Sequence, residues 1–575
     1  MRYINKVLSK NKGLIFSYIA IGIAHSFLVN FKADYFQKVI DGLTNHTIIL
    51  AGILLYGAVL IGDYLLEYAD EYPSKKLEHG IYLDFKLMAL KKISRIDYEA
   101  YQSLGTGKLV QRIENGSEAG KNLLYDFWFC VIRQLIPTIL FSVHFIWKIS
   151  RPITYAILGG YIIIFLITNA LLKVLYQIKE RILTNEEEMN HYLVRGFMEM
   201  LVFRMENQFP NEIRKAATAK KEIVRSKVKM NMVHEAFFTI FAVLVGFLNI
   251  GILIYAWNTK AFSVGSVVAL LSLLDNAYTP IAIFNVLYVQ YKLDKASFRK
   301  YESFLGLRDD EQLESGEAIC GLTGDIEIQN LSFSYGDRKI LDGLNLTIRK
   351  GEKVAFVGES GSGKSTLVKI LAGLVKYDAG SIRIDGEELK DIRLNSLYDH
   401  ISYISQDCPI FDGTLKENLV FDQDVDESRL KEAMASVQLL PLLDTMKDGM
   451  QTEIGERGTI LSGGERQRLA LARLWFEKKD LTILDEATSA MDNLTEEHVM
   501  KAVTELLDDR TVIAIAHRLN SVASFDRIIV FGEGKIIADA PFQTLLTTSP
   551  YFAALYHASV GGRLFDLGES RAVYR

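Results

Sequence analysis

The sequence is poor in cysteine and carries little net charge. Its 575 residues include three cysteines, Cys130, Cys320 and Cys408, which lie far apart and show no metal-ligand spacing. This pattern argues against a disulfide framework or a cysteine metal site and favours ordinary packing roles. The formal net charge of -5 gives no electrostatic case for nucleic-acid binding, which usually needs a basic face, so we expect no nucleic-acid partner.

Hydrophobic residues are abundant, at 49%, and their long runs are concentrated between positions 14 and 290. A helix of about 18 to 25 apolar residues can cross a lipid bilayer, because its backbone groups bond internally. Two runs, 153–172 and 236–257, contain no charged residue. Four more carry some charge: 14–36, 48–68, 123–147 and 263–290. We therefore predict six transmembrane helices. No small-residue cleavage site follows the first run, so it reads as a membrane helix and not as a signal peptide.

The connecting segments alternate in length and charge. Those at 41–47, 148–152 and 258–262 are short and poor in lysine and arginine, whereas 73–122 and 173–234 are long and rich in them. The positive-inside rule then places both termini in the cytoplasm. We expect a multi-pass protein of the cell membrane, in a bacterium the inner (cytoplasmic) membrane. The long segments have helical periodicity and are expected to extend the membrane helices into the cytoplasm.

Charged residues within the spans allow two interpretations. Asp63, Glu67 and Asp275 are candidates for a cavity that favours a cationic or peptide cargo. Alternatively they lie near span ends or pair with Lys32 or Arg133, which is the simpler interpretation.

The second half reads as a soluble α/β domain. We divide the chain into a transmembrane domain at 1–305, a polar linker at 306–324, a soluble domain at 325–550 and a tail at 551–575. Within the tail, 558–575 matches no motif.

The segment KVAFVGESGSGKST, 353–366, has the pattern of a buried strand, a glycine-rich turn and a helix start. It contains GxxxxGK[ST] in the context that phosphate binding requires. The glycines let backbone N–H groups curl around phosphate oxygens, Lys364 reaches the β- and γ-phosphates, and the Ser365 hydroxyl can ligate Mg²⁺. The predicted nucleotide-binding residues here are Gly358, Ser360, Gly361, Ser362, Gly363, Lys364, Ser365 and Thr366.

A second apolar strand, in LTILDEATS at 481–489, ends in two carboxylates. In a P-loop enzyme an aspartate at this position holds Mg²⁺, which predicts that role for Asp485. The next residue, Glu486, is placed to orient or deprotonate the attacking water as a general base.

The segment LSGGERQRLALARLWF, 461–476, lies just upstream of that strand and matches the signature of ATP-binding cassette (ABC) proteins. Together the motifs resemble that family over about 324–548. The six spans with long cytoplasmic extensions, and YQSLGTGKLVQRIENGSE at 101–118, resemble its exporter-type membrane domain. The resemblance implies a six-helix transmembrane domain plus an α/β P-loop NTPase domain of the ABC type, which hydrolyses ATP with Mg²⁺.

The resemblance also implies roles for single residues. Tyr335 matches the aromatic that stacks on adenine, and Gln406 matches the glutamine that senses Mg²⁺ and the γ-phosphate. Asp492 matches the aspartate that couples two ATP sites, with Met491 where leucine is commoner, and His517 matches the histidine that contacts the γ-phosphate. TEIGERG, 452–458, resembles the segment that exporters place against their membrane helices.

The signature further implies a partner. Ser462, Gly463 and Gly464 open a helix whose N-terminus can bind a γ-phosphate, and in this family it meets the Lys364 loop of a second chain. The chain is therefore expected to act as a dimer of half-transporters. Because LSGGE and Glu486 are both intact, a homodimer is favoured over a heterodimer, which stays open.

Three functions fit these motifs. The leading one is ATP-driven export of a small molecule, lipid or peptide by alternating access. The others are import of a bulky ligand such as a siderophore, and an ATP-gated channel or regulator. No peptidase domain precedes the first span, and nothing in the spans identifies the substrate.

Overall fold

The structure is a computed structural model that describes residues 2–47, 50–104, 106–260, 262–455, 458, 460–516 and 518–561. Its contacts divide the chain into two compact units. The first comprises the residues up to Ser94 together with Leu104–Leu307, and the second comprises Arg95–Ser103 together with the residues from Arg308 onward.

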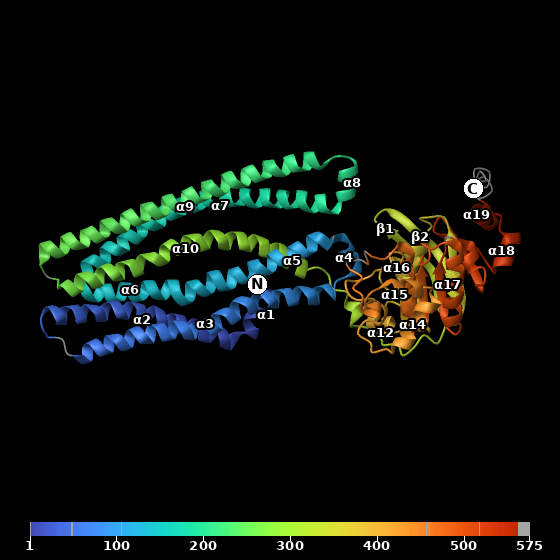
Figure 1. Ribbon diagram of the computed structural model, residues 1–575, viewed down its shortest axis with the longest axis horizontal. Helices are drawn as coiled ribbons and strands as arrows, with labels where there is room; N and C mark the ends of the chain where they lie inside the picture. Colours follow the sequence, from blue (N-terminus) through green and yellow to red (C-terminus); the bar gives the residue numbers. More distant parts are fainter. Residues whose placement is uncertain are drawn as a thin grey trace. The chain divides into compact units, whose positions relative to one another are not determined.

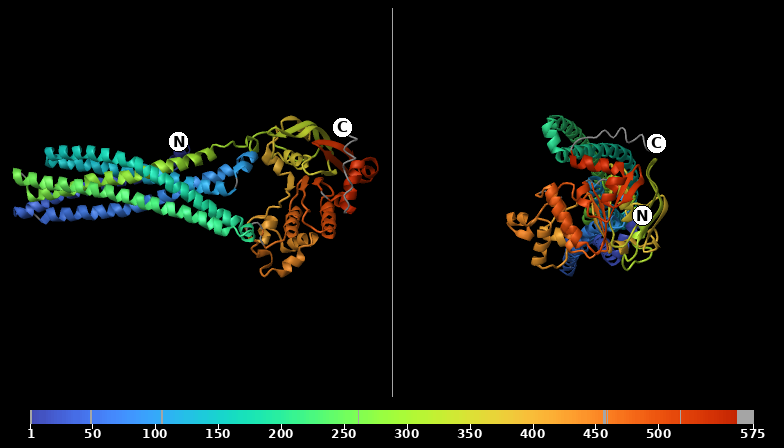
Figure 2. Two further views of the ribbon diagram at one scale, coloured as in Figure 1. Left: turned by 90° about the horizontal axis from the view of Figure 1, so that it is seen from above. Right: turned by 90° about the vertical axis from the view of Figure 1, so that its right-hand side faces the viewer.

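The first unit consists of long helices (Figure 1). They are α1 (Arg2–Lys10), α2 (Lys12–Thr44), α3 (Leu50–Ile93), α5 (Thr106–Lys121), α6 (Ile136–Ile149), α7 (Arg151–Met198), α8 (Met200–Met205), α9 (Phe209–Thr259) and α10 (Val264–Leu305). Two π-helical stretches, η1 (Asn122–Phe129) and η2 (Val131–Leu135), join α5 to α6. Both Figure 1 and Figure 2 show α7 and α9 side by side, connected through α8.

The predicted spans fall in these helices. By length and composition α2, α3, Leu109–Ile149, α9 and α10 are able to cross a membrane, and Arg151–Ile164 at the start of α7 is a shorter apolar helix among the described residues. Helices α7 and α9 are 48 and 51 residues long, so they continue well beyond the apolar runs, as expected. A helix rises about 1.5 Å per residue, and about 20 residues cross the hydrocarbon core.

The structure assigns partners to some of the charges inside the spans. Asp63 is buried, and its carboxylate lies 2.6 Å from Lys32 Nζ and 3.3 Å from His25 Nε2. Pairing is the interpretation that holds for Asp63, because an unpaired carboxylate is costly in lipid. Glu67 and Asp275 are exposed on the single chain and form no ion pair among the described residues.

Arg133 pairs with a residue that the sequence did not single out. One of its guanidinium nitrogens lies 2.6 Å from Asp70 Oδ2, and the guanidinium carbon lies 4.0 Å from the centre of the Tyr18 ring. The charge of Arg133 is therefore paired with Asp70, and its guanidinium group lies over the Tyr18 ring.

A close helix contact in the first unit depends on a glycine. The side chain of Tyr301, on α10, is fully buried, and its hydroxyl donates a 2.6 Å hydrogen bond to Phe85 O. A Cβ added at Gly116, on α5, would lie 2.3 Å from the Tyr301 Cβ. The two helices can approach this closely only because Gly116 has no side chain.

We expect Gly116→Ala to lower the melting temperature of the purified protein by several degrees, because overpacking costs about 1–3 kcal/mol. Thermal unfolding followed by intrinsic fluorescence measures the change. Gly80→Ala is the matched control, because a Cβ at Gly80 on α3 would meet no atom within 4 Å. Alanine is the better helix former by about 1 kcal/mol, so the control is expected to be neutral or slightly stabilising. Equal melting temperatures for the two variants would contradict this account.

The second unit contains two sheets. A four-stranded antiparallel sheet has the order β2-β1-β4-β5, and a six-stranded sheet has the order β10-β9-β3-β8-β7-β6. Strands β9, β3, β8, β7 and β6 run parallel, and β10 is antiparallel to β9. The strands are β1 (Ile326–Tyr335), β2 (Arg338–Ile348), β3 (Lys353–Gly358), β4 (Ala379–Ile384), β5 (Glu387–Glu388), β6 (Ile401–Ile404), β7 (Leu481–Asp485), β8 (Thr511–Ile515), β9 (Arg527–Gly532) and β10 (Lys535–Ala540).

Helices pack around these sheets and create two apolar cores. Val354 and Phe356 of β3 face one core, and Ala355 and Val357 face the other, because side chains alternate along a strand. The helices are α4 (Tyr98–Leu104), α11 (Lys364–Leu371), α12 (Leu394–Tyr398), α13 (Leu415–Val420), α14 (Glu427–Ser436), α15 (Leu440–Thr445), α16 (Gly463–Ala472), α17 (Asn493–Leu506), α18 (Phe542–Thr548) and α19 (Pro550–Gly561).

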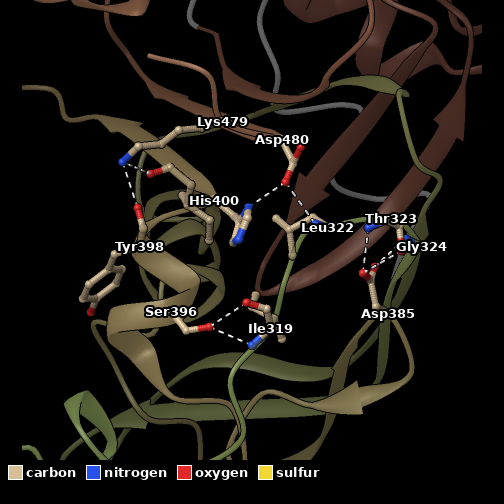
Figure 3. A network of polar contacts seen from close by, with 11 residues as sticks. Ile319, Leu322, Thr323, Gly324, Asp385, Ser396, Tyr398, His400, Lys479 and Asp480 are labelled. Atoms are coloured by element: carbon tan, nitrogen blue, oxygen red, sulfur yellow. Dashed lines mark hydrogen bonds and ion pairs between the residues drawn. The ribbon is translucent and has the colours of Figure 1, made fainter.

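The segment that leads into β1 is held by specific polar contacts (Figure 3). Ser396 bonds through its hydroxyl to both backbone groups of Ile319, at 2.7 and 3.1 Å. The Asp480 carboxylate accepts from Leu322 N at 3.1 Å and lies 2.8 Å from His400 Nδ1. Residues 319–324, in the predicted linker, are therefore anchored to the second unit.

Candidate nucleotide-binding and hydrolysis site

The predicted catalytic motifs meet at one edge of the six-stranded sheet. Because β3, β6 and β7 are parallel, their carboxyl ends lie at the same edge, with the glycine loop after β3 and the carboxylates at the end of β7. Ligands of open α/β sheets bind at this edge. The sheet topology therefore brings the glycine loop together with Gln406, Asp485 and Glu486.

The glycine loop adopts backbone conformations that other residues disfavour. Gly358, Gly361 and Gly363 have φ values of 144°, 81° and 102°. A Cβ at Gly358 would lie 2.3 Å from Phe531 O, and one at Gly363 would lie 2.6 Å from a Leu341 methyl carbon. In this loop Ser360 and Gly361 are exposed and Ser362 is buried. The loop thus has the shape that lets backbone N–H groups converge on an anion.

Lys364 is the first residue of α11, and its side chain folds back under the loop. Its Nζ donates to Gly358 O at 2.9 Å, to Glu359 O at 2.8 Å and to Ser362 Oγ at 3.3 Å. Burial lowers the pKa of Lys364, and the negative charge of Glu486 is the largest effect that opposes this. A phosphate would add the negative charge that favours the ammonium form.

Ser365 and Asp485, the two predicted Mg²⁺ ligands, lie side by side. The Ser365 hydroxyl donates to Asp485 Oδ1 at 3.1 Å, and the Tyr403 hydroxyl donates to Oδ2 at 3.0 Å. Burial raises the pKa of Asp485, and these two hydrogen bonds oppose the rise. Hydroxyl and carboxylate oxygens suit Mg²⁺, so the donor set fits that ion. Sequence reasoning missed Tyr403, whose only signal was its position on the apolar strand before Gln406.

Glu486 and Gln406 come together across the site. Gln406 Nε2 donates to Glu486 Oε2 at 2.7 Å, although the residues lie far apart in sequence. Glu486 has a φ of 54°, in the left-handed region that is strained for residues other than glycine. Such strain clusters at functional sites. The predicted His517 lies outside the described residues.

The signature residues begin helix α16. Ser462 is its N-cap: its hydroxyl accepts from Glu465 N at 3.3 Å, and the Glu465 carboxylate accepts from Ser462 N at 2.7 Å. The described contacts of Ser462, Gly463 and Gly464 do not involve the glycine loop. Their helix terminus therefore does not complete the site of its own chain.

A residue of the signature helix also touches the catalytic segment. Gln467 is buried, accepts from Ala490 N at 2.8 Å and donates to Ser489 Oγ at 3.0 Å. The segment after Glu486 is thereby tied to α16. Sequence reasoning quoted this glutamine within the signature but gave it no role.

The remaining predicted residues lie around this centre. Tyr335, at the end of β1, is 47% exposed, and its ring is available for stacking beside the start of α11. Burial raises the pKa of Tyr335, and a hydrogen bond with Thr366 opposes the rise, so these two side chains are neighbours. Asp492 is the N-cap of α17 and accepts from Thr495 N at 3.0 Å, while Met491 is buried. The segment 452–458 lies partly outside the described residues.

Comparison with known proteins shows which family these features belong to. The family described as ABC transporter transmembrane region matches residues 13–278, and the family described as ABC transporter matches residues 341–489. The chain belongs to the ABC transporter family. It is a multi-pass membrane protein with a C-terminal ATP-binding domain, so the predicted family and fold class are confirmed.

Individual relatives agree with this assignment. An uncharacterized ABC transporter ATP-binding protein of Bacillus subtilis is 38% identical over 52% of this chain and 53% of its own length. An ATP-dependent lipid A-core flippase of Dechloromonas aromatica is 40% identical over 44% of this chain and 45% of its own length. The transporter thus spans about half the length of these two relatives. A flippase of the same name from Hahella chejuensis is 28% identical over 88% of each chain.

The fold has a counterpart among solved structures. A bacterial Atm1-family ABC exporter with ATP bound superposes with a TM-score of 0.81, covering 98% of the transporter and 100% of that chain. The identity is 21%, so this likeness concerns the fold. The exporter architecture predicted from the layout of the spans is thereby confirmed.

Proposed function

We propose that the transporter is half of a dimeric ATP-driven exporter. The observation that carries this proposal is the convergence of Lys364, Ser365, Asp485, Glu486 and Gln406 at one sheet edge of a chain whose other unit is built of membrane-length helices. The relatives named flippases and the exporter of the same fold support the direction.

Each residue of the centre has a task in hydrolysis. The loop N–H groups and Lys364 hold the β- and γ-phosphates, and the Tyr335 ring stacks on adenine. Ser365, Asp485 and Gln406 would hold a Mg²⁺ ion, which neutralises the charge that develops on the phosphate oxygens. Glu486 accepts a proton from the attacking water, and Gln406, bonded to it at 2.7 Å, orients its carboxylate.

A second copy completes each site. The α16 N-terminus has N–H groups and a positive dipole end that suit a γ-phosphate, and its described contacts do not involve the glycine loop of its own chain. We propose that Ser462, Gly463 and Gly464 of one copy close over ATP held by Lys364 of the other. Two-fold symmetry then produces two such sites, and intact motifs on this chain favour a homodimer. We propose that Asp492, the N-cap of α17, couples the two sites.

Binding and hydrolysis would drive alternating access. ATP favours the closed pair of cassettes because it contacts both copies, and the long cytoplasmic helices transmit closure to the membrane. We place the protein in the cytoplasmic membrane, with both termini and the cassette on the cytoplasmic side, by the charge of its connecting segments.

Transport into vesicles tests the direction. We expect inside-out vesicles that contain the transporter to accumulate at least one compound from a panel of amphipathic dyes, lipids and peptides when ATP is added. Vesicles with the Glu486→Gln variant are the control and should show no ATP-dependent accumulation. Uptake only by right-side-out vesicles loaded with ATP would indicate an importer instead. An ATP-gated ionic current would indicate a channel.

A further inference from the structure

A cavity of about 620 Å³ lies in the first unit, between the π-helical stretch and α10. Its size is within the range that holds one drug-sized molecule. The catalytic centre lies in the other unit and does not use it. It is lined by aromatic residues on one side and by basic residues at its rim, and this combination indicates the chemistry of a ligand.

One wall of the cavity is aromatic. Phe284, Tyr288 and Tyr291 follow one another at helical spacing on α10, so they share a face. Opposite them stand Phe127 and Trp128. The rings of Phe127 and Tyr291 stack with centroids 4.3 Å apart, and the Trp128 ring meets Tyr291 edge-on at 6.2 Å. Because Phe127 already stacks on Tyr291 and is buried, the ring that remains accessible to a flat aromatic group is that of Trp128, which is 46% exposed.

The backbone that carries Phe127 and Trp128 is unusual. Stretches η1 and η2 are both π-helical, and Val131 of η2 also lines the cavity. The π-helix is rare and is frequently found at functional sites, because each added residue rotates the following side chains. The irregularity therefore coincides with one wall of the cavity.

The rim of the cavity is basic and lacks compensating charge. Lys292, Lys295 and Arg299 follow the aromatic residues on α10, are exposed, and form no ion pair with any described residue. Lys292 Nζ lies 5.3 Å from the Tyr288 ring centre, and Lys295 Nζ lies 5.7 Å from that of Tyr291.

Nearby acidic groups have other partners. Asp294 is buried and accepts from Gln290 Nε2 at 3.0 Å, and Asp126 lies 3.7 Å from Lys121 Nζ. No aspartate or glutamate is among the described residues that line the cavity. The next lysine on α10, Lys300, does have a partner, with its Nζ 3.6 Å from Glu187.

We propose that this cavity binds an amphipathic organic anion with a planar aromatic body, which stacks on the exposed Trp128 ring beside the aromatic face of α10, with its acidic group on the Lys292, Lys295 and Arg299 rim. The inference rests on the proposed function in that the anion would be the transported cargo. It differs from the cationic or peptide cargo that Asp63, Glu67 and Asp275 suggested; of these three residues, Asp63 is neutralised by Lys32. A two-chain phospholipid exceeds a cavity of this size and would insert only its headgroup.

Isothermal titration calorimetry of the dimer in phosphatidylcholine nanodiscs, without nucleotide and corrected with empty nanodiscs, tests the proposal. The probes are pyrenesulfonate, pyrenemethanol and pyrenemethylammonium, which share one ring system and differ in charge. We expect the sulfonate to bind with one site per chain, about tenfold more tightly than the neutral alcohol, and the cation to bind more weakly still. Equal binding of the three, or none by the sulfonate, would overturn the proposal.

Variants separate the cavity from the rest of the surface. Lys292→Gln, Lys295→Gln and Arg299→Gln combined should weaken sulfonate binding about tenfold or more, since charge-assisted contacts are lost. Trp128→Leu should weaken all three pyrenes, since stacking is lost. The matched control combines Lys220→Gln, Lys221→Gln and Lys300→Gln, which removes the same charge from exposed positions outside the cavity and should leave binding unchanged.

Two further outcomes would separate anion binding in this cavity from lipid binding and from the proposed export function. If native mass spectrometry shows phosphatidylglycerol retained by the wild type and lost from the cavity triple, while pyrenesulfonate does not bind, the cavity is a lipid headgroup site and the proposal fails. If the protein binds the sulfonate but hydrolyses no ATP, the cavity site is supported and the proposed export function is wrong. If it transports a compound with ATP but does not bind the sulfonate, the export function is supported and the proposed cavity site is wrong.

Discussion

A Glu486→Gln protein is expected to bind ATP with nearly unchanged affinity and to hydrolyse it about 10²- to 10⁴-fold more slowly, which is the usual contribution of a general base. The amide has the size of the carboxylate and can keep the contact with Gln406 Nε2, which is 2.7 Å long in the structure. It cannot accept a proton from the attacking water. Binding would be measured with a fluorescent ATP analogue, and hydrolysis by phosphate release from the purified dimer.

The control for this variant is Glu432→Gln. Glu432 is exposed on α14 and belongs to none of the nucleotide-binding motifs, so the hydrolysis rate of this variant should stay at the wild-type value. Near-normal ATP hydrolysis by Glu486→Gln would show that Glu486 is not the general base. Loss of ATP binding would instead show that its negative charge mainly supports Lys364.

Mixing two inactive variants should restore activity if each ATP site is shared by two chains. A Lys364→Ala dimer lacks the phosphate-binding ammonium in both sites, and a Ser462→Arg dimer blocks the signature helix in both. In the mixed dimer one site carries both changes and the other carries neither. We expect hydrolysis at up to about half of the wild-type rate, because one of two symmetric sites is intact.

The alternative is that each chain uses its own Ser462. Every site of the mixed dimer then keeps one defect, and the mixture stays as inactive as its parents. The variants would be coexpressed with different affinity tags and the mixed dimer purified through both. The matched control is a mixed dimer of Lys364→Ala and Glu486→Gln chains. Lys364 and Glu486 of one chain serve the same ATP site, so each site of this mixed dimer has one defect. That mixture should remain inactive under the shared-site arrangement.

The nucleotide-binding loop could be read from the sequence because its chemistry is local. Gly358, Gly361 and Gly363 are needed for positive φ, and Lys364 and Ser365 follow within one turn, so a short motif contains the whole requirement. The placement of Asp485 at a strand end followed in the same way from an apolar run that stops at a carboxylate.

The contacts around these residues depend on chain segments that the sequence does not connect. Tyr403 reaches Asp485, and Gln467 reaches Ala490, because β6, β7 and α16 meet in the folded domain. Among the charges of the first unit, the sequence offered Asp63 two partners, and the packing of α2 against α3 selected Lys32.

The sequence by itself determined the family, the two kinds of domain and the residues that touch the phosphates, because glycine conformations, apolar run lengths and motif spacing are properties of short segments. Tertiary structure alone decided that Gln406 meets Glu486, that Ser462 bonds within its own helix start, and that the π-helical stretch and α10 line an open aromatic cavity with a basic rim. Those features depend on which segments pack together, and such packing results from long-range burial of apolar surface.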